Sequence, residues 1–146
     1  MSRFLACLVL ALVPGVAWAQ TAADSSAIRA SVLDYVESWY TGDAERMERA
    51  LHPELAKRII RTNAQGKNTL DQMGAMRLVQ SVRAGYGKKT PPAEQIKVVA
   101  ILDIYQNIAS ARAEMSGWID HLHLAKWDGR WVIVNVLWDL KPTPSK

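Results

Sequence analysis

The chain has 146 residues, of which 49% are hydrophobic, with 18 lysines and arginines against 14 aspartates and glutamates. Its net charge of +4 is small and scattered along the sequence, whereas a nucleic-acid-binding protein concentrates positive charge in a patch or stripe. The single cysteine, Cys7, excludes an internal disulfide framework. We therefore expect no nucleic-acid partner and a fold that depends on packing.

Residues 1–19 have the pattern of a secretory signal peptide. A short basic start is followed by an apolar run at 4–13, a Pro-Gly break and small residues up to Ala19. The apolar run is too short to cross a hydrocarbon core of about 30 Å. We expect cleavage before Gln20, which leaves one domain, residues 20–146, in the periplasm or outside the cell, with no membrane attachment.

Two helices are predicted at the start of the mature chain. The first is expected to be capped by residues 24–26 and to end before Gly42, since its apolar residues recur at three- to four-residue spacing. The second is expected at 44–51, between the cap Asp43 and the break that Pro53 imposes.

The middle of the chain predicts a third helix. Residues 55–62 favour a short extended piece, and residues 63–67 favour a turn. Thr69 and Gln72 have the spacing of a capping box, so the helix is expected at 70–84.

From residue 96 the apolar residues alternate, so residues 96–140 are expected to form four antiparallel strands. Three helices followed by such strands predict an α+β fold with the helices packed on one face of an antiparallel sheet. The first hairpin turns at residues 106–107. The pairs that follow from this turn are Ile104 with Ala109, Leu102 with Ala111, Ala100 with Ala113 and Val98 with Met115.

Asp128-Gly129 lies between two apolar runs and is the strongest hairpin signal in the chain. A two-residue turn at this point sets every later pair of the two strands, and a longer turn would exchange their faces. The pairs predicted on the face of Trp131 are Leu124 with Ile133, Leu122 with Asn135, Asp120 with Leu137 and Trp118 with Asp139.

Three polar side chains, Asp120, Asn135 and Asp139, interrupt this otherwise apolar face. A buried carboxylate is costly unless it is paired or hydrogen-bonded, which favours a cavity that admits water or ligand. The alternative is that Asp120 and Asp139 lie at strand ends, in solvent, and that Asn135 satisfies a backbone group. Tyr35 and Trp39 of the first helix are expected at the mouth of the pocket or in the core. The candidate ligand-binding residues are Tyr35, Trp39, Trp118, Asp120, Asn135 and Asp139.

The opposite face of this hairpin is broad and apolar, which is typical of a dimer surface. His121 and His123 lie on it, but no third ligand is evident, so we expect no metal site. The mature chain has no cysteine, no Gly-x-Ser-x-Gly elbow and no phosphate-binding glycine loop, so nucleophilic catalysis has little support. We expect no cofactor. The other residues of this face are Ile119, Val132, Val134, Val136 and Trp138.

The segments Tyr35-Val-Glu-Ser-Trp-Tyr-Thr-Gly-Asp43, Met47-Glu-Arg-Ala-Leu-His-Pro-Glu-Leu55 and His123-Leu-Ala-Lys-Trp-Asp-Gly-Arg-Trp131 are similar to those of a known family. The chain resembles the putative lumazine-binding branch of the nuclear transport factor 2-like (SnoaL-like) superfamily. The resemblance implies a cone-shaped fold with a curved sheet of about four main strands, a pocket between helices and sheet, and a homodimer formed through the sheet. The superfamily includes ketosteroid isomerase, scytalone dehydratase and polyketide cyclases.

Three functions follow as hypotheses. The first is an exported protein that binds a small hydrophobic or heterocyclic ligand in an apolar, aromatic pocket. The second is an isomerase, dehydratase or cyclase that acts on a hydrophobic ring compound, with Asp120 as catalytic base and Asn135 and Tyr35 polarising a carbonyl. The third is a structural or accessory homodimer with a filled core.

Overall fold

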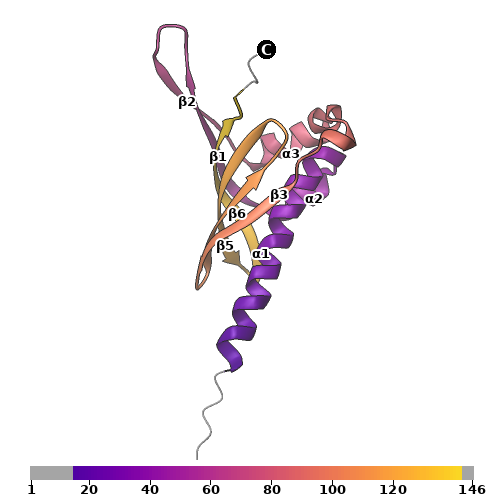
Figure 1. Cartoon of the computed structure of the whole chain (residues 1–146), viewed down its shortest axis with the longest axis vertical. Coiled ribbons are helices and arrows are strands. Elements are labelled where there is room, and N and C mark those ends of the chain that lie inside the picture. Colours follow the sequence, from indigo (N-terminus) through magenta and orange to yellow (C-terminus); the bar gives the residue numbers. More distant parts are fainter. Residues whose placement is uncertain (1–14, 143–146) are drawn as a thin grey trace, which may run out of the picture.

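The computed structural model describes residues 15–142, which form three α-helices, two short 3-10 turns and six strands (Figure 1). The predicted signal segment lies largely outside these residues. The elements are α1 (Gly15–Thr41), α2 (Ala44–Ala50), β1 (Leu51–Thr62), β2 (Asn68–Met73), α3 (Ala75–Arg83), η1 (Tyr86–Lys89), η2 (Pro92–Glu94), β3 (Val98–Tyr105), β4 (Ile108–Glu114), β5 (Trp118–Trp127) and β6 (Arg130–Leu140).

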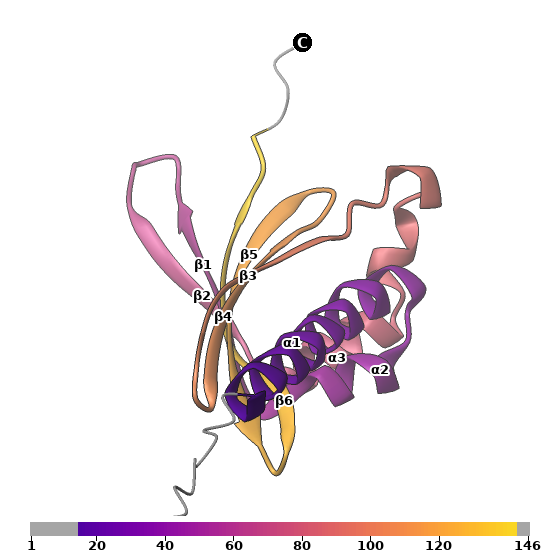
Figure 2. The same cartoon turned by 60° about the horizontal axis from the view of Figure 1, so that its bottom comes forward.

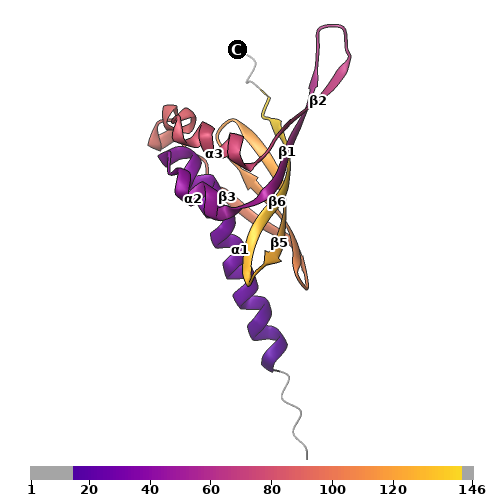
Figure 3. The same cartoon turned by 180° about the vertical axis from the view of Figure 1, so that it is seen from behind.

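The fold class is α+β, as predicted, but the sheet is larger than expected and mixed. Six strands lie in the order β2-β1-β6-β5-β4-β3. Every neighbouring pair is antiparallel except β1 and β6, which are parallel. The expectation of about four antiparallel strands was wrong because β1 and β2 form a hairpin that joins the sheet at β6. This hairpin extends past the other strands (Figure 3).

The predicted third helix begins five residues later than expected, because residues 68–73 form a strand. The two side chains of the supposed capping box make cross-strand contacts. Gln72 Oε1 accepts a hydrogen bond from Arg58 Nε at 2.8 Å, and Thr69 Oγ1 lies 3.4 Å from the Arg61 carbonyl. Pairing with β1 therefore overrides the local capping signal, and α3 begins after Gly74.

The three helices lie on one face of a strongly twisted sheet (Figure 2). The buried stripe of α1 includes Ile28, Val32 and Val36, which pack in one core with Leu122 and Ile133 of the sheet. The second helix is capped as predicted, since the Asp43 side chain accepts a hydrogen bond from the Arg46 backbone N–H.

The first helix begins at Gly15, so residues 24–26 lie inside it and do not cap it. Asp24 ties the helix to the hairpin of β5 and β6. Its Oδ1 accepts hydrogen bonds from Lys126 Nζ at 2.8 Å and from Trp131 Nε1 at 2.9 Å. These bonds lower the pKa of the Asp24 carboxyl, with the Lys126 bond contributing most.

In both predicted hairpins, the residue pairs next to the turn are confirmed, and the pairs predicted beyond the bulges described below are wrong. Trp127 pairs with Arg130, and Ile104 pairs with Ala109. Val134 of β6 and Leu102 of β3 have no paired residue on the neighbouring strand, so each forms a β-bulge. Beyond each bulge the strand exchanges its faces. The observed pairs include Leu122 with Val136, Asp120 with Trp138, Trp118 with Leu140, Ile101 with Ala111 and Val99 with Ala113.

Candidate functional site

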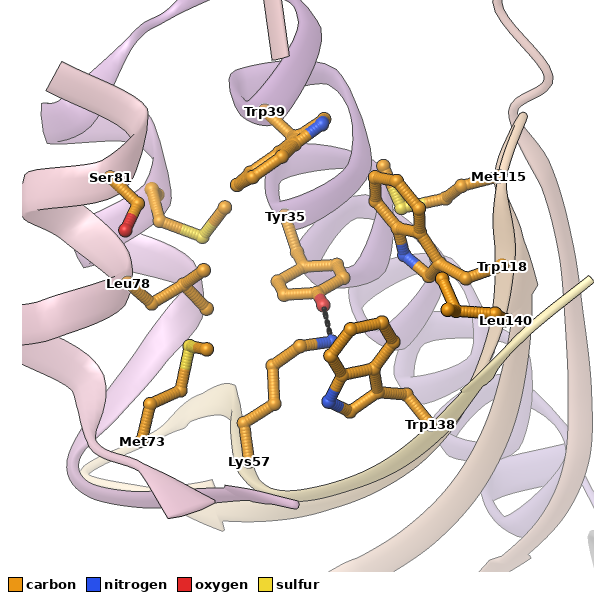
Figure 4. A pocket seen from close by; sticks show the side chains of 11 residues that line it. Tyr35, Trp39, Lys57, Met73, Leu78, Ser81, Met115, Trp118, Trp138 and Leu140 are labelled. Atoms are coloured by element: carbon orange, nitrogen blue, oxygen red, sulfur yellow. Dashed lines mark hydrogen bonds between the residues drawn. The ribbon is translucent and has the colours of Figure 1, made fainter. Parts of the chain in front are cut away.

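A cavity of about 180 Å³ lies between the helices and the inner face of the sheet (Figure 4). Its lining is mostly apolar, and its polar side chains other than the tryptophans are Lys57, Tyr35 and Ser81. The principal lining side chains are Tyr35 and Trp39 of α1, Met47 of α2, Lys57 of β1, Met73 of β2, Leu78 of α3, Trp118 of β5 and Trp138 of β6. We call this the aromatic cavity.

Three tryptophans form one wall of the aromatic cavity. The rings of Trp39 and Trp118 have centroids 5.5 Å apart at 90°, and those of Trp118 and Trp138 lie 6.2 Å apart at 71°. Such edge-to-face contacts stabilise each pair by about 0.5–1.5 kcal/mol beyond area burial. The three rings are therefore held in place where they line the cavity.

A buried polar cluster of three side chains lies beside this wall. Lys57 Nζ donates to Asp120 Oδ1 at 2.5 Å and to the Tyr35 hydroxyl at 2.8 Å, while that hydroxyl donates to Asp120 Oδ2 at 2.9 Å. Trp118 Nε1 donates to the same Oδ2 at 3.2 Å. The Asp120 side chain is 0% exposed and that of Lys57 is 6% exposed. The carboxylate is thus satisfied by three donors in the interior.

Burial and the charge of Asp120 shift the pKa of Lys57 and the pKa of Tyr35. Burial lowers the pKa of the Lys57 ammonium, and the Asp120 carboxylate opposes this shift. Burial raises the pKa of the Tyr35 hydroxyl well above its ordinary value, and the charge of Asp120 and its hydrogen bond add to the rise. Lys57 Nζ also lies 4.8 Å from the centroid of the Trp138 ring, within cation–π range. Tyr35 is therefore a neutral donor in the physiological pH range.

Strand alternation brings Lys57 to the cavity. Leu55, Lys57 and Ile59 share the inner face of β1 and are all buried. Asp120 lies between Ala113 of β4 and Trp138 of β6, and the small alanine leaves room beside the carboxylate.

A glycine allows the loop after α3 to pack against Trp39. A Cβ atom built on Gly87 would lie 2.0 Å from the Trp39 carbonyl oxygen and 2.5 Å from Cδ1 of its ring. Only glycine permits this approach, so any side chain at position 87 would displace Trp39 or the loop.

The structure brings together four of the six predicted site residues. Tyr35, Trp39 and Trp118 line the aromatic cavity, and Asp120 lies beneath them, bonded to Tyr35 and Trp118. The carboxylate itself does not line the cavity. Its three donors and complete burial do not favour the expected role of catalytic base.

Asn135 and Asp139 lie on the opposite face of the sheet, so their predicted position was wrong. Asn135 Oδ1 accepts from Arg58 at 2.9 Å, and Asp139 is exposed. The physical reason is the bulge at Val134, which directs Val136 and Trp138 inward. The bulge therefore removes two polar side chains from a buried surface.

Sequence reasoning missed Lys57 and Trp138. Lys57 lies in a segment whose alternation of Leu55, Lys57 and Ile59 predicts a strand with an inward lysine, and this signal was available. Trp138 was assigned to the outer face because the hairpin register was extended past Val134 without a bulge.

The outer face carries His121 and His123, both exposed. Among residues 15–142, no group of three His, Cys, Asp or Glu side chains is placed to hold a metal ion. None of the helices in this part of the chain combines the length and apolar character that a membrane crossing requires.

Solved structures share this fold. An NTF2-like protein of unknown function from Shewanella baltica matches with a TM-score of 0.65 at 22% identity, covering 84% of this chain and 97% of that one. One from Silicibacter pomeroyi matches with a TM-score of 0.63 at 20% identity, covering 83% and 98%. An NTF2-like protein with a cystatin-like fold from Novosphingobium aromaticivorans matches with a TM-score of 0.62 at 13% identity, covering 85% and 86%. No curated protein matches the chain.

The family model described as "Putative lumazine-binding" matches residues 23–139, which include α2, α3, most of α1 and all of the six strands except the last residue of β6. The chain therefore belongs to the putative lumazine-binding family, with the NTF2-like fold that its sequence resemblance implied.

Proposed function

We propose that this protein binds a small planar heterocycle in the aromatic cavity. The observation that carries the proposal is a cavity walled by Trp39, Trp118 and Trp138 beside the buried cluster of Lys57, Tyr35 and Asp120. Flat aromatic walls with a few fixed polar groups are typical of small-molecule sites. The description of the family supports a ligand of the lumazine type.

The size of the cavity limits the ligand. A cavity of about 150 Å³ in another protein holds a single benzene ring. The aromatic cavity, at about 180 Å³, is only slightly larger. One or two fused rings, as in lumazine, are therefore a better fit than a four-ring steroid.

Lys57 is the polar group that can orient such a ring. An ammonium has three donors, and Asp120 and Tyr35 account for two of them. The third is available to a carbonyl or ring nitrogen of the ligand. Because Lys57 is held by two partners, its direction is set before the ligand arrives, which lowers the entropic cost of binding.

An acid–base enzyme is the second candidate, favoured by the hydrogen-bonded chain from Lys57 through Tyr35 to Asp120. A proton taken up or released by a ligand at Lys57 could pass along this chain. Replacing Asp120 by asparagine would abolish turnover by such an enzyme. In a binding protein it would lower stability and loosen Lys57, while the aromatic lining would keep part of the affinity. A structural dimer with a filled core has no use for the cavity, so we place it third.

We also propose that the protein acts after export and as a homodimer. Export rests on the signal pattern of residues 1–19. Dimerisation rests on the outer sheet face, where Ile60, Leu70 and Leu137 are all at least half exposed. Cell fractionation and light scattering of the mature protein test these two points.

Lumazine titration, followed by tryptophan fluorescence, tests the binding function. We expect saturable quenching in the wild type. Trp39→Leu removes one ring of the wall, which is expected to cost about 1–2 kcal/mol, or roughly tenfold in affinity. Trp127→Leu is the matched control, because Trp127 is 54% exposed and lies outside the cavity. Absence of saturable quenching, or equal losses in both variants, would contradict the proposal.

A further inference from the structure

A second hollow, of about 360 Å³, adjoins the aromatic cavity. The two share Lys57, Met73 and Trp138. Beyond these shared residues, the character of the lining changes from apolar to polar. The main polar side chains added are Arg61, Asp71, Gln72 and Arg77. We call this second space the polar hollow.

The polar hollow carries one positive charge that is not already neutralised. Lys57 is paired with Asp120, and Arg61 is paired with Asp71 at 2.7 Å. Within residues 15–142, Arg77 has no ion-pair partner. An anion in the hollow would therefore meet an unpaired guanidinium.

Two further features favour an anion. Arg77 lies in the first turn of α3 and is exposed, so its guanidinium is accessible to an anion from solvent. The Arg61–Asp71 pair has side chains 51% and 57% exposed, so it is weak and can rearrange. A guanidinium binds a carboxylate or a phosphate through two parallel hydrogen bonds, which suits both groups equally.

The spacing of Arg61 from Lys57 requires a linker between the ring and the anion. Lys57 and Arg61 lie on the same face of β1, four residues apart, which is about 13 Å along an extended strand. A ring beside Lys57 and an anion beside Arg61 or Arg77 must be separated by a short chain. Trp138 and Met73 lie between the two spaces and contact both.

Building on the proposed heterocycle-binding function, we propose that the ligand is amphipathic. Its one or two rings occupy the aromatic cavity, and a short chain carries a carboxylate or phosphate into the polar hollow to pair with Arg77. The aromatic cavity supplies affinity for the ring, and the polar hollow selects ligands with an anionic tail over neutral ones.

Four synthetic probes test this: lumazine, and lumazine with a 4-hydroxybutyl, a 3-carboxypropyl or a 3-phosphooxypropyl chain on its pyrazine ring. In the wild type, we expect an anionic probe to bind roughly three- to tenfold more tightly than the hydroxybutyl probe, with a difference that shrinks as salt is added. Whichever anionic probe binds more tightly identifies the tail as carboxylate or phosphate.

Two variants locate the effect. Arg77→Gln is expected to abolish the preference for anionic tails and to leave the affinity for lumazine unchanged. Arg83→Gln, on the same helix, exposed and outside the hollow, removes the same charge and should keep the preference. If the wild type binds lumazine but binds charged and neutral tails equally well, the proposal of an amphipathic ligand is overturned and the heterocycle-binding function stands. Failure of every probe to bind, lumazine included, would overturn the heterocycle-binding function and this inference with it.

Discussion

The buried pair of Lys57 and Asp120 gives the sharpest test of the site. Lys57→Met leaves the Asp120 carboxylate 0% exposed and without its cation, and removing one partner of a buried pair costs about 3–5 kcal/mol. Asp120→Leu leaves the Lys57 ammonium unpaired and should cost a similar amount. Because a domain of this size has a total stability of about 5–15 kcal/mol, either loss is large.

The double variant Lys57→Met with Asp120→Leu should be more stable than either single variant. It buries no unpaired charge, and replacing both members of a buried pair by apolar side chains is often neutral. A cost of about 1–3 kcal/mol remains, because Tyr35 and Trp118 lose the acceptor to which they donate. We therefore expect a coupling of at least about 3 kcal/mol between the two positions.

Urea unfolding of the four proteins, followed by circular dichroism at 10 °C, measures this cycle. A single variant that is already unfolded without urea still gives a result, because its stability is then lower than that of a folded double variant. Additive losses, with the double variant the least stable of the four, would refute the claim that the pair is a desolvated, mutually dependent unit.

Three further predictions concern pH and packing. The pKa of Asp24 is lowered by Lys126 and Trp131, so its contribution to stability is present above about pH 4 and is lost as the pH falls. In the Asp24→Asn variant, the urea concentration at the unfolding midpoint should depend less on pH in this acid range. The pKa of Tyr35 is raised, so above about pH 10 the unfolded state loses this proton first and stability falls. In an ultraviolet titration, the Tyr35→Phe variant should lack the tyrosine that ionises at the highest pH in the wild type. A titration curve identical to that of the wild type would contradict the burial of Tyr35. Gly87→Ala would place a Cβ 2.0 Å from the Trp39 carbonyl; we expect weaker lumazine binding and a lower melting temperature, whereas Gly117→Ala, which meets no atom within 4 Å, should have little effect on either.

Local patterns predicted those parts of the fold in which the determining residues are neighbours in sequence. The turn at residues 128–129 forms as expected, with positive φ at both positions. The cap at Asp43 also forms. The capping box at Thr69 and Gln72 failed because its two side chains found partners on β1, 8 and 14 residues earlier across the turn at residues 63–67, and pairing in this hairpin outweighed the capping signal.

The candidate site was predicted in part for the same reason. Tyr35 and Trp39 follow from helical periodicity, and Asp120 lies on the inner face as strand alternation predicts. Asn135 and Asp139 were misplaced because a bulge leaves no clear mark in a run of β-branched residues such as that around Val134. The bulge is favoured by what it achieves in three dimensions, since it moves an amide and a carboxylate from a buried face to a solvated one.

The bulge at Val134 also affects how this chain can be compared with its relatives. The alternation of inward and outward side chains shifts by one residue at the bulge. A single misplaced gap in an alignment would therefore assign Leu137 in place of Trp138 to the aromatic cavity. At 13–22% identity, sequence alignment alone is a weak guide to that gap. The pairing of Trp138 with Asp120 is a structural landmark independent of the gap, and site residues are best transferred between family members from that point outward.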